Sequence, residues 1–381
     1  MLFTKRISSL VLLSLLSSVV SCSSINSSGS EEITVTDSLN RDIKVDLSKI
    51  KKVVCVGAGA LRLFSYVGNL DLLSGAEDID RNIDSANTFK NASRPYYDVN
   101  VEKFEKLPSC GVGGPEKQSP EYDKILNCAP DIVFSEYTDE NVVKNMEENL
   151  QVPIVCLSYG SNSVFDENVK KSLNVISTIC KNEKSKALIK YIEESEASLK
   201  SYKNENSTDK WYVGCLGNWG KQTYTSTSNN YPLFNVNNLT NAFDKSYALQ
   251  KGQVNLDALI TADPTVMILD SAGIDLFKDA YNKDSVLRDS LANISAVKNN
   301  KVYLQMPFNA YYTNLEIALM DAYYISSIAY PDKYTNVNLE DKYNEISEKF
   351  LGVRCYSQIK SKPASKNGFQ NIGSLSTFFS N

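Results

Sequence analysis

Aromatic and cationic residues recur directly after apolar, strand-like runs of this 381-residue chain. Arg62 follows the run at 53–56, and Trp219 follows the run at 211–216 in a loop of glycines and polar residues. Loops at the carboxyl ends of parallel strands are where α/β proteins bind ligands. Aromatic rings would supply contact area there, and arginines would supply paired hydrogen bonds to negative oxygens. The residues predicted to bind in this way are Arg62, Arg94, Tyr137, Tyr159, Trp219, Tyr224, Tyr231, Tyr311 and Tyr312.

Several of these residues also have a purely structural interpretation. The glycine-rich segment before Arg62 would be only a tight turn, with Arg62 paired to a nearby carboxylate. Arg94-Pro-Tyr-Tyr97 would be an ordinary surface loop, and Tyr231 would only staple its own loop. Tyr311 and Tyr312 cannot both face the core in an extended segment, because neighbouring side chains point opposite ways. We therefore expect one of these two tyrosines to face a cleft.

The chain contains no histidine. A Ser-His-Asp or Cys-His catalytic arrangement and a histidine-rich zinc site are therefore impossible. Any direct metal ligand would come from Tyr, Asp, Glu, Met or Cys, whereas a cation already held by an organic chelator needs no ligand from the protein. The sequence thus predicts a binding protein with no catalytic residue and no cofactor, and it leaves open whether any side chain contacts a metal.

Charge and cysteine content narrow the class of protein further. The formal net charge of -5 argues against a nucleic-acid partner, which calls for a basic face. Seven of the eight cysteines remain after Cys22, and an odd number cannot pair completely. Cys55, Cys156 and Cys215 lie inside apolar runs, where a free thiol behaves as a small hydrophobe. We expect these cysteines to be buried free thiols rather than parts of a disulfide framework or of a cysteine-bound metal site.

The N-terminus has the pattern of an export signal. Lys5 and Arg6 precede an apolar stretch at 10–20, which is too short to span a bilayer. A small residue stands before Cys22, as in a bacterial lipoprotein signal, so we predict a signal peptide at 1–21, acylation of Cys22 and a Ser-rich tether at 22–32. The protein would then be extracytoplasmic, monomeric and anchored to the cell membrane. The alternative is an ordinary signal peptide with Cys22 incidental.

The rest of the chain reads as repeated βα units. A hairpin is expected at 33–45, and short apolar runs then alternate with amphipathic helical patterns. Such repeats imply parallel sheets covered on both faces. The fold predicted is α/β, with two similar lobes of parallel-rich sheets joined by a long rigid helix. Its parts are an N-terminal lobe at 33–165, a helical connector at 166–203, a C-terminal lobe at 204–352 and a tail at 353–381, of which 356–366 is expected to be solvated surface.

Five motifs, found in the same order along this chain as in a known family, indicate a family resemblance. They are Thr34-Val-Thr-Asp37 with Arg41 and Val45, Val53-Val-Cys-Val-Gly57, Ala129-Pro130-Asp131, Lys301-Val-Tyr303 and Tyr311-Tyr-Thr-Asn-Leu-Glu316. In these the chain resembles a solute-binding lipoprotein of ABC importers, of the type with a helical backbone between the lobes that serves iron-siderophore, haem and cobalamin uptake. The resemblance covers residues 33 to about 352. It implies a ligand cleft between the lobes and a membrane permease as partner.

The resemblance also implies the ligand class and the docking residues. It points to an iron(III) chelate of the siderophore type, with haem, a corrinoid or an oxyanion as alternatives; an enzyme on a related scaffold and a structural surface lipoprotein are the other classes. Many metal-ion binders of neighbouring groups use histidines that this chain lacks, which favours a chelate over a bare ion. Glu116 resembles in placement the family's permease-docking glutamate, and Asp244 is the candidate for the second lobe.

Overall fold

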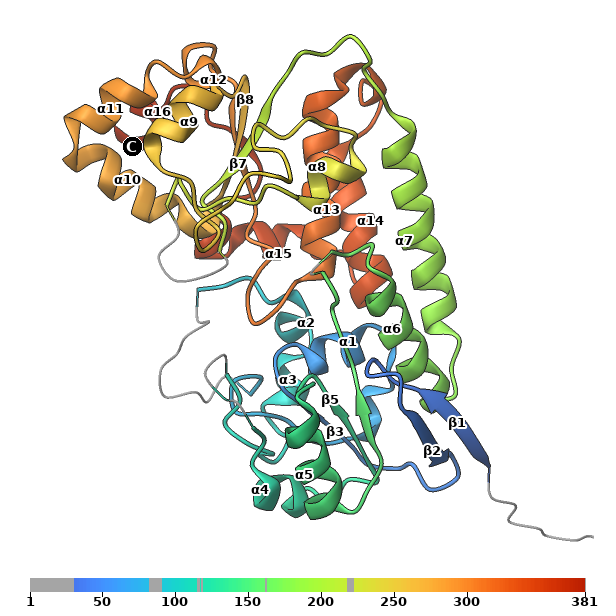
Figure 1. Cartoon of the computed structure of the whole chain (residues 1–381). Coiled ribbons are helices and arrows are strands. Elements are labelled where there is room, and N and C mark those ends of the chain that lie inside the picture. The colour runs from blue at the N-terminus through green and yellow to red at the C-terminus, as the bar shows by residue number, and fades with distance from the viewer. Residues whose placement is uncertain are drawn as a thin grey trace, which may run out of the picture.

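The computed structural model describes residues 31–81, 91–114, 117, 119–161, 163–217 and 223–380. They form two α/β lobes, with the long helix α7 (Lys184–Ser201) running alongside both (Figure 1). Each lobe is built on a four-stranded sheet, and a separate two-stranded hairpin precedes the first. The two-lobed α/β fold predicted from the sequence is confirmed.

The hairpin pairs β1 (Glu32–Thr36) with β2 (Asp42–Asp46), as predicted. Asp37 stabilises the turn of the hairpin. Its buried carboxylate accepts hydrogen bonds from the Arg41 side chain and from the backbone nitrogen of Cys156. Arg41 also pairs with Glu147 at 2.6 Å. These contacts attach the hairpin to the last strand of the first lobe.

The first lobe has a parallel sheet in the order β4-β3-β5-β6. Successive residues of its central strand face opposite cores: Val53 and Cys55 pack on one side of the sheet, Val54 and Val56 on the other. A strand that is buried on both faces has to be apolar throughout, which is why the run was readable in the sequence. The strands are β3 (Val53–Val56), β4 (Leu73–Gly75), β5 (Ile132–Ser135) and β6 (Ile154–Cys156). The helices are α1 (Ala60–Val67), α2 (Pro95–Asp98), α3 (Val101–Phe104), α4 (Tyr122–Asn127) and α5 (Glu140–Leu150).

Two helices, rather than one, connect the lobes. α6 (Glu167–Ile179) ends where Lys181 takes a positive φ of 52°, and α7 begins three residues later. Asn182 stabilises the break, because its amide donates to the Val67 carbonyl while its side-chain oxygen accepts from Ser177. The connector therefore bends back on itself before α7 rises along the second lobe.

The second lobe repeats the arrangement with the sheet order β10-β9-β8-β7. The first three strands of this lobe in sequence, β7 to β9, are parallel, and β10 is antiparallel to β9. The strands are β7 (Trp211–Gly214), β8 (Val266–Asp270), β9 (Val302–Gln305) and β10 (Gln370–Asn371). The helices are α8 (Pro232–Val236), α9 (Leu256–Ala262), α10 (Ile274–Lys283), α11 (Ser285–Leu291), α12 (Ser295–Lys298), α13 (Leu315–Ala329), α14 (Leu339–Leu351), α15 (Tyr356–Ser361) and α16 (Leu375–Ser380).

The C-terminal segment is more integrated than the sequence indicated. We expected residues 356–366 to be solvated surface, but Tyr356 and Ile359 are buried, so that expectation is wrong for the apolar face of α15. Farther on, β10 extends the sheet and Phe379 of α16 packs edge-on against Phe277 at 5.0 Å. Lys360, the one lysine of α15, is half-buried, and Lys362 and Lys366 beyond the helix pair with Asp98 and Asp275 at 2.6 and 2.8 Å.

Two further features concern the described residues. The seven cysteines from Cys55 to Cys355 are free thiols, and all except the half-buried Cys180 are buried, as expected. Within the described ranges, no helix combines the length and apolar composition needed to cross a membrane.

Candidate ligand-binding site

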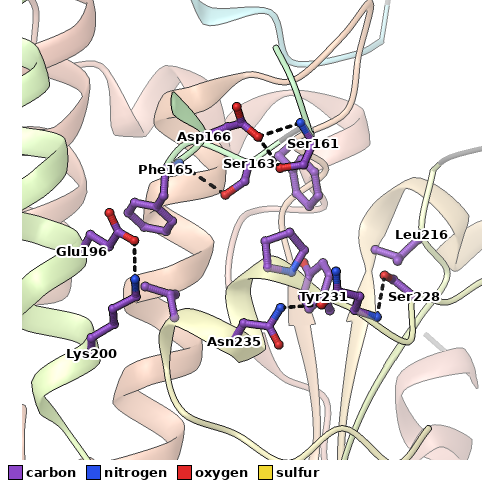
Figure 2. Close-up of a pocket in the computed structure, with 14 residues that line it drawn as sticks. Ser161, Ser163, Phe165, Asp166, Glu196, Lys200, Leu216, Ser228, Tyr231 and Asn235 are labelled. Carbon is purple, nitrogen blue, oxygen red and sulfur yellow. Dashed lines mark hydrogen bonds and ion pairs between the residues drawn. The ribbon is translucent and has the colours of Figure 1, made fainter. Parts of the chain in front are cut away.

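A cavity of about 540 Å³ lies between the two lobes (Figure 2). The first lobe lines it with Ser161, Ser163, Phe165 and Asp166 from the loop after β6. The second lobe contributes Leu216 after β7, Phe308 after β9, and Tyr231 with its neighbours at the start of α8. The cavity therefore lies beside the carboxyl ends of strands from both lobes, where ligands bind in folds of this kind. We call it the interlobe cavity.

The polar groups of the interlobe cavity are held in place by local hydrogen bonds. Asp166 caps α6, accepting from the backbone nitrogen of Asn168 at 2.8 Å and from the nitrogen and hydroxyl of Ser161 at 2.8 and 2.6 Å. Burial opposes ionisation, but the bonds from Ser161 and Asn168 prevail and lower the pKa of Asp166. On α7, Glu196 and Lys200 form an ion pair at 2.5 Å. The cavity thus has a fixed carboxylate on one wall and a neutralised pair on another.

Three tyrosines follow strands close to the interlobe cavity. Tyr159 stacks on Tyr312 with ring centroids 4.6 Å apart, and its hydroxyl donates to the Gly59 carbonyl at 2.9 Å. Gly59 has a φ of 79°, and a Cβ there would lie 2.6 Å from the Tyr159 hydroxyl, so only glycine fits. Tyr137 adjoins the other glycine of this turn, Gly57. Tyr137 and Tyr312 are half-buried, whereas Tyr159 is buried.

Glu136 lies within this tyrosine group. It directly follows β5, and a Cβ on Gly57 would lie 3.3 Å from its own Cβ. Burial raises the pKa of the Glu136 carboxyl to about 8, although a backbone hydrogen bond from Tyr159 opposes the shift. Burial, and then the charge of Glu136, raise the pKa of Tyr312.

Arg62 lies in the contact between the lobes, on α1. Its side chain is fully buried, and its guanidinium donates to the carbonyls of Ala310, Tyr311 and Thr313 at 2.6, 2.8 and 3.3 Å. It also stacks over the Tyr96 ring at 4.6 Å. The expected alternative partner was a carboxylate, whereas the structure supplies backbone carbonyls of the other lobe. Arg62 does not line the interlobe cavity, and direct ligand contact by this residue stays a prediction.

Arg94 is also turned into the protein. It donates to the Ile79 carbonyl at 2.8 Å, lies 3.5 Å from the Asp80 carboxylate and stacks on Tyr97 at 4.7 Å. Asp80 in turn accepts from the Tyr96 hydroxyl. The segment at 94–97 is therefore part of the buried first lobe rather than a surface loop, and Arg94 does not line the interlobe cavity.

Tyr311 and Tyr312 have different partners in the first lobe, but the segment is not the extended one that the prediction from their adjacency had assumed. The Tyr311 hydroxyl donates to Glu77 at 3.0 Å and accepts from the Gly114 nitrogen at 3.1 Å, so its side chain is inserted into the first lobe. Both residues have positive φ, 53° and 71°, a conformation that costs free energy for a side chain of this size. The contacts of Tyr311 with the first lobe and the stacking of Tyr312 on Tyr159 hold this conformation in place.

In the second lobe, Tyr231 and Tyr224 have different surroundings. Tyr231 lines the interlobe cavity, and its hydroxyl hydrogen-bonds with the Gln305 amide, which donates to Asp270 at 3.1 Å. Burial raises the pKa of Asp270 to about 7. Tyr224 instead packs against Phe277 at 5.0 Å in the core of the second lobe, and it does not line the cavity.

Other predicted residues lie outside this geometry. Trp219, Glu116 and Cys22 fall outside the described residues. Asp244 is exposed on the second lobe and accepts from the backbone nitrogen of Ser246 at 2.7 Å. Their roles stay predictions.

Sequence reasoning missed several residues of the interlobe cavity. Phe165 and Asp166 lie nine or more residues beyond the end of β6, so proximity to a strand gave no signal for them. Glu196 and Lys200 looked like the solvated face of a charged helix. Phe308 had a usable signal, because it follows β9 within three residues.

Comparison with known proteins agrees with this architecture. The molybdate-binding protein MolA of Haemophilus influenzae is 22% identical over 256 residues, which are 60% of this chain and 69% of MolA. A periplasmic solute binding protein from Veillonella parvula has 17% identity and a TM-score of 0.64, over 91% of this chain and 99% of that one. The petrobactin-binding protein YclQ from Bacillus subtilis has 20% identity and a TM-score of 0.54, over 79% and 99%. At these identities the structures show a shared fold.

A family model decides the assignment. The model described as periplasmic binding protein matches residues 80–307, which include strands of both lobes and the connecting helices. Proteins of this family bind solutes for ABC transporters and are not enzymes, and what they hold is a transported substrate rather than a cofactor. The chain belongs to the periplasmic binding protein family.

Proposed function

We propose that this protein captures a metal chelate of the iron(III)-siderophore type between its lobes and delivers it to a membrane permease. The observation that carries the proposal is the interlobe cavity, which both lobes build beside the carboxyl ends of their strands. Its volume of about 540 Å³ is in the range of pockets that bind organic ligands of drug size. A tetrahedral oxyanion has only five heavy atoms and would fill a small part of it.

The lining of the interlobe cavity supports a large organic ligand. Phe165, Tyr231 and Phe308 offer flat apolar surface from both lobes, and serine and asparagine side chains offer hydrogen bonds between them. Such a mixture suits a chelate, whose outside combines hydrocarbon with polar oxygens. Haem and corrinoids share the flat apolar surface and remain alternatives of the same transporter class.

An oxyanion is the second candidate, because the relative MolA is named for binding molybdate. Tetrahedral oxyanions are held by arginine, lysine and backbone N–H groups. Among the described residues that line the interlobe cavity, the one cation is Lys200, which is already paired with Glu196. The geometry therefore favours the chelate.

The location and docking proposals rest on sequence. Acylation of Cys22 would tether the protein outside the cytoplasmic membrane, and Glu116 with the exposed Asp244 would meet basic residues of the permease. Reversing the charge of Glu116 should then reduce uptake while ligand affinity stays unchanged.

Identification of the bound ligand tests the proposed function. The protein should be purified from its native host without chelators, and the released small molecules analysed by mass spectrometry together with metal content. A stoichiometric organic chelate that contains iron supports the proposal. Stoichiometric molybdenum, or an organic ligand without metal, contradicts it.

A further inference from the structure

The charges around the interlobe cavity are unequal. Its described lining residues include two carboxylates, Asp166 and Glu196, and one cation, Lys200. Since Lys200 is paired with Glu196 at 2.5 Å, Asp166 is the charge left without a counter-ion. Asp166 is held ionised by the hydrogen bonds it accepts from Ser161 and Asn168.

The nearby arginines do not offset these acids. Arg62 donates to three carbonyls of the loop at 310–313, and Arg94 donates to the Ile79 carbonyl beside Asp80. Turning either guanidinium toward a ligand would leave buried acceptors unpaired, which is costly in a buried site. The guanidinium groups of Arg62 and Arg94 are therefore used in contacts within the protein.

Such a site discriminates between ligands by their net charge. A trianionic ferric tris-catecholate would bring negative charge close to Asp166, and the described lining residues offer no unpaired cation to neutralise it. Like charges in a partly buried site repel strongly. A neutral ferric tris-hydroxamate has no such penalty. Its carbonyl and N–O oxygens accept hydrogen bonds, and the cavity offers donors in Ser228, Asn230 and Asn235.

We propose that the interlobe cavity selects metal chelates of zero or positive net charge, of the tris-hydroxamate class, and rejects polyanionic chelates and oxyanions. The inference rests on the proposed function, since it specifies which chelate the cavity accepts. A pendant ammonium group on such a chelate would be attracted to Asp166.

Four probes of different charge test the inference on the mature chain. They are a neutral ferric tris-hydroxamate, a ferric tris-hydroxamate with a free ammonium, a trianionic ferric tris-catecholate, and molybdate, each titrated by calorimetry at pH 7. The hydroxamates should bind at least about 100-fold more tightly than the catecholate and molybdate. Equal or tighter binding of the catecholate or of molybdate overturns the inference.

A charge-neutral variant sharpens the test. Asp166→Asn keeps a helix-capping side chain, because asparagine is as good a cap as aspartate. It should bind the ammonium-bearing chelate about tenfold more weakly and the catecholate more tightly than the wild type does. Asp284→Asn is the matched control, since Asp284 caps α11 in the second lobe and does not line the cavity. Unchanged affinities for both charged probes in Asp166→Asn would overturn the assignment.

The two proposals can fail separately. If none of the four probes binds, the net charge of the ligand recovered from the native host decides the charge inference: a neutral or cationic ligand supports it and a polyanion overturns it. The metal content of that same ligand decides the proposed function.

Discussion

The guanidinium of Arg62 donates a hydrogen bond of 2.8 Å to the backbone carbonyl of Tyr311, which is 249 residues away in the other lobe. In return, the Tyr311 side chain reaches back into the first lobe and bonds to Glu77 and Gly114. The loop at 309–313 thus connects the lobes in both directions, separately from α6 and α7. Lobes joined in two places are expected to move little when ligand binds.

Arg62→Ala should strongly destabilise the protein. The change leaves three buried carbonyls unpaired and opens a void under Tyr96, so we expect a loss of about 3–5 kcal/mol in the free energy of unfolding. Urea denaturation followed by circular dichroism measures this. Arg354→Ala is the control, because that exposed pair with Asp341 should contribute at most about 1 kcal/mol. Equal effects of the two variants would show that the Arg62 contacts are not important for stability.

Glu77→Gln should change how stability depends on pH. Burial, and then the charge of Asp80, raise the pKa of Glu77 to about 8, against hydrogen bonds from Gly57 and Tyr311 that lower it. A carboxyl with a raised folded-state pKa stabilises the fold most below its unfolded pKa, and this stability is lost as pH rises toward 8. The wild type should therefore lose stability between about pH 5 and 8, by an amount on the order of a few kcal/mol from this group.

The glutamine variant, which has no charge to bury, should lack that part of the slope. It should match the wild type near pH 4.5 and exceed it at pH 8, as measured by urea midpoints across the range. Parallel pH curves for the two proteins would contradict the assignment of the slope to Glu77.

Tyr312→Ala should weaken ligand binding. Tyr312 is half-buried and stacks on Tyr159 of the first lobe, so truncation removes aromatic surface between the lobes. We expect a loss of about 1–3 kcal/mol in the binding free energy of the ligand recovered from the native host. The control is Tyr122→Ala, since Tyr122 is also half-buried but belongs to α4 and packs within the first lobe. A larger loss of affinity in Tyr122→Ala than in Tyr312→Ala would show that the ligand binds elsewhere.

Trp219 should report on ligand binding through its fluorescence. The chain has two tryptophans, and Trp211 is buried in β7. In a Trp211→Phe background the emission comes from Trp219 alone, and the native ligand should quench it if the loop after β7 contacts the ligand. Small-angle scattering of the same samples should show almost unchanged dimensions. If the fluorescence of Trp219 is not quenched at saturating ligand, Trp219 does not contact the ligand.

Cys22→Ala should abolish lipid attachment. If Cys22 is the acylated first residue of the mature protein, the variant should leave the membrane fraction or remain as an uncut, larger precursor. Mass spectrometry of the wild-type N-terminal peptide distinguishes these cases from an ordinary signal peptide. A mature wild-type chain without lipid mass at residue 22 would contradict the prediction.

The sequence alone was enough for the strands β3 to β9 and for the class of fold, whereas the single connecting helix that it predicted is two helices and β10 was not predicted. Runs such as Val53–Val56 are apolar at every position because both faces of their sheet are covered, and α5 is amphipathic because one side of it is exposed. These patterns are local, so they could be read without knowing what packs against them. The alternation of strands and helices then implied parallel sheets in two lobes.

The roles of individual side chains depended on tertiary structure. Arg62 follows a strand at the expected edge, but its direction is decided by carbonyls of a loop 248 to 251 residues farther along the chain. Asp166 and Lys200 border the interlobe cavity only because α6 and α7 fold back beside it. Local patterns record which face of an element is buried, whereas hydrogen-bond partners, net charge in a cavity and access to ligand are set by distant segments meeting in space.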